Sequence, residues 1–168
     1  MKAKNYRKIK GQPYTRKEYI RSSPPSKITK FTMGETGKDF PIEAKLIASK
    51  SAQVRHNALE AARIASNRLL SEKLGTNYLL QIVPYPHTIL RENKMIFGAH
   101  ADRLQDGMRK SFGKPIATAA RVKSDHPVII IGVDEDAVEI AKESLRLSQS
   151  KLPMPCHIEI EKTGDEQQ

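Results

Sequence analysis

The residues of this chain that could do acid–base chemistry lie before or within one long polar stretch. His87 and His100 come first, Asp102 and Asp106 follow, and the His100–Asp102 spacing suits proton transfer between an imidazole and a carboxylate. No activated nucleophile accompanies them, and "GKPIAT" (113–118) lacks the upstream glycine spacing and the following Ser or Thr of a phosphate-binding loop. Their spacing fits no compact metal site. The sequence therefore predicts that the protein is not an enzyme and that it binds neither a metal nor another cofactor.

The same stretch has the composition of an RNA-binding loop. Residues 101–121, "ADRLQDGMRKSFGKPIATAAR", hold two acids and five basic residues: Arg103, Arg109, Lys110, Lys114 and Arg121. Arginine offers phosphate a planar fork of donors, and lysine offers a mobile point charge. Three glycines would let the backbone approach a sugar-phosphate chain: Gly98, Gly107 and Gly113. Four apolar side chains could pack against bases or anchor the loop root: Met95, Phe97, Met108 and Phe112.

Positive charge is gathered in two segments of the chain. The net charge is +10, and residues 1–30 hold ten Lys or Arg with one acid. Residues 87–123 hold eight basic and three acidic residues, whereas residues 134–168 hold four basic and nine acidic ones. This asymmetry predicts one side that faces a polyanion and another that faces solvent.

The first 26 residues are expected to be an extension that does not fold alone. They offer few sizeable apolar groups, and burying these cannot offset the backbone entropy of ordering the segment. The extension is expected to stay disordered or to order against a partner that neutralises it. Its tyrosines, Tyr6, Tyr14 and Tyr19, could stack on unpaired bases or pack on the domain edge. Its predicted RNA contacts are Lys4, Arg7, Lys8, Lys10, Arg16, Lys17 and Arg21.

The remaining pattern predicts a single α+β domain over residues 27–161, with a mixed or antiparallel sheet and two helices packed on it. Strands are predicted at 27–32, 42–49, 77–83, 87–91, 115–123, 128–133 and 155–161. The unbroken apolar run 128–131 should lie centrally in the sheet. A long basic internal loop spans 92–114, a length that is usually functional or disordered. Residues 162–168 are expected to form a flexible tail.

Two helices are predicted from their capping residues and apolar spacing. The first runs from a Ser51 cap to Lys73 or Leu74 and ends at Gly75. Its inner face is expected to carry Ala58, Ala62, Ala65 and Leu69, widened by Leu59 and Leu70, with Arg55, Arg63 and Arg68 in solvent. The second helix covers 134–150, capped by Asp134, with Val138, Ala141 and Leu145 inward.

Other features bound the class of protein. No apolar run approaches the about 20 residues that a membrane helix needs. The basic N-terminus has no apolar segment behind it, so no secretory signal is expected. Cys156 is the only cysteine, which excludes an internal disulfide and fits a reducing, cytoplasmic location.

Three segments together resemble a known family: "ALEAARIASNRLL" (58–70), "PYPHTILRENKM" (84–95) and above all "ADRLQDGMRKSFGKPIATAARV" (101–122). They resemble the large-subunit ribosomal protein family called L-sixteen in bacteria and L-ten-e in archaea and eukaryotes. The similarity runs from about residue 5 to about residue 160. The chain stops soon after its last predicted strand, which resembles archaeal members. Lys110 and Ser111 depart from the smaller or more apolar residues often found there.

The resemblance implies a structural component of the large ribosomal subunit with a compact α/β domain. It implies binding to large-subunit rRNA near the path of aminoacyl-tRNA, beside the central protuberance, with the loop turned toward the peptidyl-transferase region. Expected partners are rRNA, tRNA near the loop tip and neighbouring ribosomal proteins, without membrane or DNA. Outside the extension, the expected RNA contacts are Arg91 at the loop root, Lys94, Arg103, Arg109, Lys110, Lys114, Arg121 and Lys123.

Two alternatives from other classes stay open at this level. A free-standing RNA-binding regulator outside the ribosome would sediment with light, soluble fractions on a sucrose gradient. A metal-dependent nuclease would cleave RNA in a reaction that EDTA stops and that His100→Ala abolishes.

Overall fold

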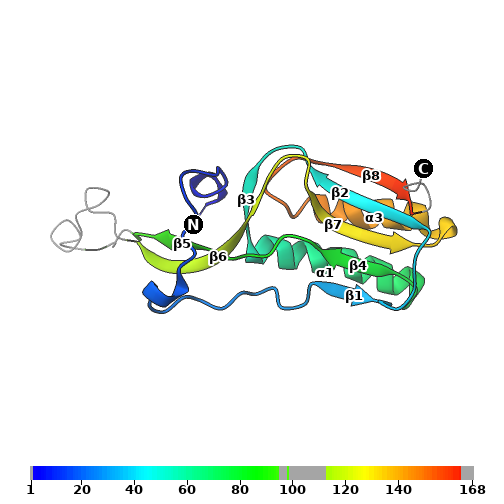
Figure 1. The fold of residues 1–168 in the computed structure, drawn as a ribbon, viewed down its shortest axis with the longest axis horizontal. Helices are drawn as coiled ribbons and strands as arrows, with labels where there is room; N and C mark the ends of the chain where they lie inside the picture. The colour runs from blue at the N-terminus through cyan, green and yellow to red at the C-terminus, as the bar shows by residue number, and fades with distance from the viewer. Residues whose placement is uncertain (1, 95–97, 99–112, 164–168) are drawn as a thin grey trace.

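Over the residues that the structure describes, the protein folds into two antiparallel sheets and two helices, which confirms the α+β class (Figure 1). The computed structural model describes residues 2–94, 98 and 113–163. A five-stranded sheet has the order β1 (Thr32–Gly34), β4 (Leu79–Ile82), β7 (Pro127–Val133), β2 (Ile42–Ala48), β8 (Cys156–Lys162). A three-stranded sheet has the order β3 (Ala52–Arg55), β6 (Lys114–Val122), β5 (Thr88–Glu92). The first sheet is called the large sheet below, and the second the small sheet.

Strand β7 lies at the centre of the large sheet, as its apolar run predicts. Val128, Ile129 and Ile131 are fully buried. On the face away from the helices, Gly132 is covered by the ring of Phe40, where an added Cβ would lie 3.1 Å from a ring carbon. Ile130, on the same face as Gly132, is half-buried, so the strand is fully buried on the helix side and partly covered on the other side.

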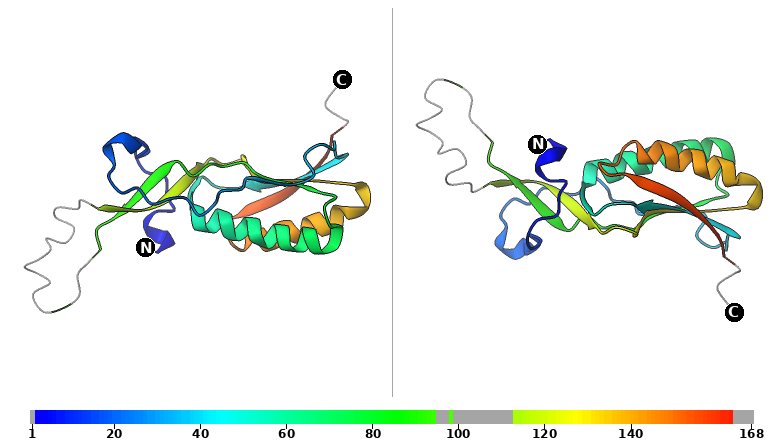
Figure 2. Two further views of the ribbon diagram at one scale, coloured as in Figure 1. Left: turned by 90° about the horizontal axis from the view of Figure 1, so that it is seen from below. Right: turned by 90° about the horizontal axis from the view of Figure 1, so that it is seen from above.

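Helices α1 (His56–Leu74) and α3 (Val138–Gln149) cover one face of the large sheet (Figure 2). They approach closely because small polar side chains lie between them. The Ser66 and Ser148 hydroxyls are hydrogen-bonded to each other, and Ser148 Oγ donates to the carbonyl of Ala62 at 3.1 Å. Three short 3₁₀ turns complete the described elements: η1 (Ala3–Asn5), η2 (Lys17–Tyr19) and η3 (Glu135–Ala137). Within the described residues, no helix is both long enough and apolar enough to cross a membrane.

The start of the first helix was predicted wrongly. Ser51 does not cap it, because residues 52–55 form β3 and pair with β6. The Ser51 hydroxyl instead accepts the N–H of Ser124 at 3.0 Å. The helix begins at His56, whose Nδ1 accepts the N–H of Lys27 at 2.7 Å. Its end at Gly75, which has a φ of 64°, is as predicted.

The predicted strand at 27–32 is also wrong, because β1 begins only at Thr32. The carbonyl of Phe31 still accepts the Ile82 N–H at 2.8 Å, so the chain runs beside β4 before the ladder begins. Ile28 is nevertheless buried in the core, with 2 % of its surface exposed. The apolar alternation was therefore real, but it marks an irregular segment tucked against the core.

The buried stripe of α1 is rotated by about one residue from the prediction. The buried positions are His56, Leu59, Ala62, Ser66 and Leu70, while Ala58, Ala65 and Leu69 are half-buried. The rotation follows from the contact of α1 with α3 through Ser66 and Ser148. A prediction based on apolar residues alone does not include these serines. Val138, predicted inward on α3, is likewise half-buried.

Two polar predictions on the helices need correction. Arg63 is not solvated: it pairs with Glu60 in a two-point contact, and this hydrogen bonding holds the pKa of the Glu60 carboxyl below its usual value. Asp134 makes no capping hydrogen bond. Its carboxylate accepts instead from Lys38 Nζ at 2.8 Å and from Asn77 Nδ2 at 2.7 Å.

Candidate nucleic-acid interface

The small sheet carries the chain away from the helices as a hairpin of β5 and β6 (Figure 1). The strands pair from Thr88↔Ala119 to Glu92↔Lys114. The register shifts between Leu90 and Arg91, so that one extra residue, Ile116, bulges on β6. The hairpin positions Arg91 on one strand and Lys114 on the other, at the root of the predicted loop.

Gly113 is required at this root by close backbone contact. A Cβ built there would lie 2.9 Å from both the Cβ of Arg91 and the backbone nitrogen of Glu92. Real Cβ atoms do not approach so closely, so only glycine lets the two sides of the hairpin meet here. Gly98 lies in an open position with a φ of 142°.

The N-terminal extension crosses the small sheet from one edge strand to the other. At β3, the Gln53 N–H donates to the carbonyl of Arg7 at 2.7 Å. In the middle, Arg121 Nη1 of β6 donates to the carbonyl of Gly11 at 2.9 Å. At β5, the Ile89 N–H donates to the carbonyl of Tyr14 at 2.8 Å. The extension therefore satisfies groups on both open edges of this sheet.

Aromatic contacts hold the extension at the same strands. The ring of Tyr6 packs on the apolar cluster of Leu90 and two alanines of β6, and the Arg55 guanidinium lies 5.7 Å from its centroid. The Arg91 guanidinium lies 4.4 Å from the centroid of Tyr14. Cation–π contacts of this kind add to the apolar burial. Tyr19 is different, with 74 % of its surface exposed.

The fold of the extension departs from the expectation of disorder or of order only against a polyanion. The structure orders it on the protein's own small sheet. The expectation counted apolar side chains alone. The extension is held instead by its backbone carbonyls, which accept hydrogen bonds from Gln53, Ile89 and Arg121. Such hydrogen bonds to distant residues leave no local pattern in the sequence.

The cations of the extension point away from these contacts. All seven predicted RNA contacts of the extension are exposed: Lys4, Arg7, Lys8, Lys10, Arg16, Lys17 and Arg21. In the part of the chain that the structure describes, none of the seven pairs with a carboxylate, and Arg7 donates only to the Pro153 carbonyl at 3.3 Å. Exposed cations without counter-ions fit an external polyanion.

The predicted contacts on the small sheet lie beside the extension. Arg91, Lys94, Lys114 and Lys123 are exposed, and Arg121 is half-buried beneath residues 10 and 11. We call the exposed cations of residues 4–21, together with Arg91, Lys94, Lys114, Arg121 and Lys123, the basic surface. Several predictions lie outside the described residues: Arg103, Arg109, Lys110, Gly107 and the four apolar loop residues.

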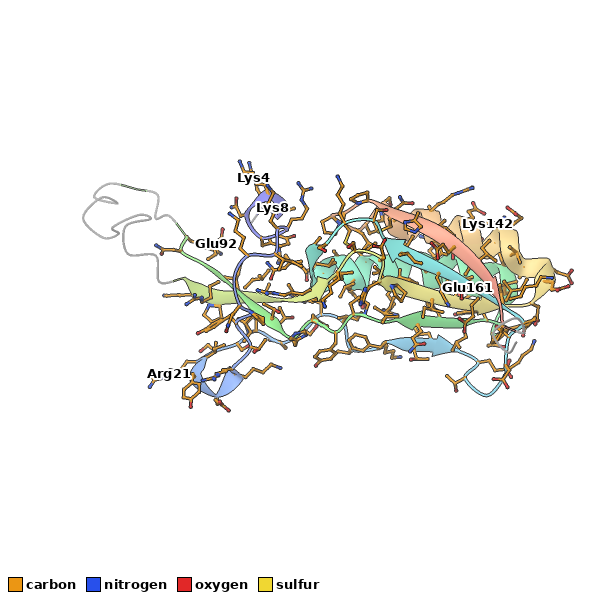
Figure 3. All side chains as sticks on the ribbon, turned by 45° about the horizontal axis from the view of Figure 1, so that its top comes forward. Lys4, Lys8, Arg21, Glu92, Lys142 and Glu161 are labelled. Carbon is orange, nitrogen blue, oxygen red and sulfur yellow. The ribbon has the colours of Figure 1, made fainter. Side chains whose placement is uncertain are left out.

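The opposite end of the molecule is acidic and internally paired. Lys38 binds Asp134 at 2.8 Å, and with Asn77 it lowers the pKa of that carboxyl. Lys142 binds Glu139 at 2.6 Å. Figure 3 shows Lys4, Lys8 and Arg21 around the hairpin end, whereas Lys142 and Glu161 lie at the other end. The charge asymmetry of the sequence is therefore a separation in space.

The acid–base candidates do not assemble in the described part of the chain. His87 is exposed, and its Nδ1 lies 3.0 Å from the carbonyl of Tyr85 in a local turn. Across residues 2–94, 98 and 113–163, no three His, Cys, Asp or Glu side chains converge as a metal site would require. His100, Asp102 and Asp106 lie outside these residues.

Comparison with known proteins decides the family. A family model described as ribosomal protein L16p/L10e matches residues 9–159. The chain belongs to this family. Relatives called large ribosomal subunit protein uL16 include that of Staphylothermus marinus, 52% identical over 93% of this chain and 90% of the relative. Those of Thermoplasma acidophilum and Sulfolobus acidocaldarius are 48% and 51% identical over 95% and 92% of this chain.

Membership of the L16p/L10e family confirms the resemblance on which the sequence interpretation depends, including its archaeal character. It is a family of ribosomal proteins. Gln53 holds the extension on β3, a structural role that the sequence interpretation missed. It is 7 % exposed, and its Nε2 donates to the carbonyls of Tyr6 and Lys8 at 2.9 and 3.3 Å. A glutamine in a short alternating segment gives no signal for that role.

Proposed function

We propose that the chain is a structural constituent of the large ribosomal subunit, in the cytoplasm, and that it binds large-subunit rRNA through the basic surface. The carrying observation is that two basic segments far apart in the sequence meet at one end of the molecule, while the acidic third lies at the other end. Among the described residues, the seven cations of the extension have no carboxylate partner. It has no catalytic role and needs no cofactor. Family membership supports the ribosomal part of this proposal.

The contacts divide by chemistry. Lysines and arginines of residues 4–21 lie on both sides of the hairpin, because the extension crosses the small sheet and continues past β5 (Figure 2). They suit phosphates of rRNA segments on either side. Tyr19, largely exposed and beside Lys17, suits stacking on an unpaired base.

The hairpin gives the proposal its direction. Arg91 and Lys114 mark the root of the internal loop, and we place the loop, with Arg103, Arg109 and Lys110, nearest to aminoacyl-tRNA and the peptidyl-transferase surroundings. Gly98, Gly107 and Gly113 would allow its backbone to approach RNA. The motif "ADRLQDGMRKSFGKPIATAARV" and the family match support this assignment.

The test is the salt dependence of rRNA binding by the full chain. With 6–10 phosphate contacts, affinity should fall by roughly 10³–10⁵ between 50 and 200 mM salt. Affinity that stays flat over this range would contradict the proposal. Crosslinks from purified large subunits, mapped to nucleotides, check the position: contacts remote from the aminoacyl-tRNA path would refute that part.

A further inference from the structure

Strand β8 forms an open edge of the large sheet, and its free side can be identified from the hydrogen bonds of its neighbour. Among the described strands it pairs with β2 alone, over seven residues without a register shift. Figure 1 shows no other strand beyond it. Ala48 of β2 turns its polar groups toward β7, donating to the His126 carbonyl and accepting from the Asp125 N–H. Because these groups alternate along a strand, Ile47 turns toward β8, and its partner His157 turns toward β2.

The alternation assigns every residue of β8. Thr163 donates to the Pro41 carbonyl at 2.9 Å, so the odd-numbered residues face β2. Cys156 faces outward, and its carbonyl accepts from Gln149 Nε2 at 2.9 Å. The N–H and C=O groups of Ile158, Ile160 and Lys162 therefore point away from the sheet, and none has a hydrogen-bond partner among the described residues.

The side chains along this edge have two distinct faces. Ile158 and Ile160 lie on the helix side, where Ile158 packs on the core and Ile160 stays 39 % exposed because no strand lies beyond it. The opposite face carries His157, Glu159 and Glu161, all exposed. Lys45 of β2 is shared between Glu161 and Glu43, and Glu159 Oε1 lies 3.0 Å from His157 Nε2.

We propose that this edge takes an extended, basic segment of a neighbouring large-subunit protein as an added strand. Apolar side chains of that segment would cover Ile160, and alternating lysines or arginines would meet Glu159 and Glu161. The carboxylates repel rRNA phosphate, and a second copy of β8 would bring like charges together. The inference rests on assembly into the large subunit, as proposed above, but not on the basic surface.

The first test uses a photoreactive benzoylphenylalanine in place of Glu159, in purified large subunits. The expected crosslink joins it to a protein segment in which basic and apolar residues alternate. A crosslink to rRNA, a crosslink to a second copy, or no crosslink would overturn the inference. Absence of the chain from large subunits would overturn the proposed function as well, which separates the two failures.

The second test compares Ile160→Pro with Ile160→Ala in the crosslinking chain. Both substitutions remove the isoleucine side chain, but only proline also removes the outward N–H. Edge strands tolerate proline at positions where the N–H points away from the sheet. The crosslink yield should be about two- to tenfold lower for proline, the effect of one net hydrogen bond. Equal yields would overturn the inference. Both variants should keep the rRNA affinity of the unsubstituted chain.

Hydrogen exchange supplies a readout that needs no folded proline variant. The amides of Ile158, Ile160 and Lys162 should exchange about two- to tenfold more slowly in large subunits than in the free chain. The amide of Gln81, inside the same sheet, serves as reference. Unchanged exchange at β8 would overturn the inference.

Discussion

At the scale of single residues, Gly113 decides whether the two sides of the hairpin can meet at its root. Replacement by alanine places a methyl group 2.9 Å from Arg91 Cβ and from the Glu92 nitrogen, so the backbone must shift. We expect Gly113→Ala to lower the free energy of unfolding by about 1–3 kcal/mol, as overpacking does. Urea denaturation measures this.

The matched control for that substitution is Gly37→Ala. Nothing lies within 4 Å of a Cβ at Gly37, and its φ is not positive. Alanine there should leave stability unchanged or raise it by about 0.4–1 kcal/mol through the unfolded chain. Equal destabilisation by both substitutions would show that the contact at Gly113 is not decisive.

His56 gives the fold a pH dependence whose sign follows from its surroundings. Burial, and then the positive charges of Arg55 and Lys27, lower the pKa of its imidazole. Its Nδ1 must also stay unprotonated to accept the Lys27 N–H. The unfolded imidazole takes up its proton near pH 6.5 and the folded one at lower pH, so stability is complete above about 6.5. It should fall as the pH falls toward the folded pKa.

The measurement is the unfolding free energy of the chain and of His56→Gln between pH 7.5 and 5. Glutamine keeps an acceptor but does not titrate, so the difference between the two proteins should shrink as the pH falls. Each unit of pKa depression corresponds to about 1.4 kcal/mol. Parallel curves would rule out His56 as the source.

At the scale of elements, β3 joins the N-terminal extension to the domain through Gln53. Its side chain donates to the Tyr6 and Lys8 carbonyls, and its backbone N–H donates to Arg7. Gln53→Ala removes the two side-chain bonds and should weaken docking of residues 2–10 by about 1–3 kcal/mol. Faster tryptic cleavage after Arg7 and Lys8 measures the release.

Gln81→Ala is the control for this effect, because Gln81 is exposed on β4 of the large sheet. It should leave the cleavage rate unchanged. If Gln53→Ala cleaves no faster than the control, the backbone contacts alone hold the extension.

Sequence patterns predicted most elements, and the failures have a common cause. The apolar run of β7 and the glycine after α1 report local requirements, so both were predicted correctly. Strand β3 was missed because its four residues become a strand only by pairing with β6. Docking of the extension was missed because Gln53 lies 47 positions from its acceptor on Tyr6. Pairing between distant segments leaves no periodic pattern of residues in the sequence.

At the scale of the whole molecule, the fold converts a charge pattern along the chain into two ends of opposite character. The extension and the β5–β6 hairpin are distant in sequence, yet the hydrogen bond from Ile89 to Tyr14 places them together. The acidic C-terminal third, which includes α3 and β8, lies at the far end of the molecule. The positions of the charges in the fold, and not the net charge alone, therefore distinguish the two ends.

Two charge-matched double variants separate position from net charge. Lys8→Ala with Lys10→Ala removes two exposed cations of the extension. Lys73→Ala with Lys142→Ala removes two cations of the opposite end, near the end of α1 and near the start of α3. Both variants lose the same charge. The slope of log affinity against log salt for large-subunit rRNA should fall by about 1.4–1.8 in the first, as expected for two lost phosphate contacts, and stay unchanged in the second. Equal changes in both slopes would mean that RNA senses only the total charge, and the basic surface would then have no specific role.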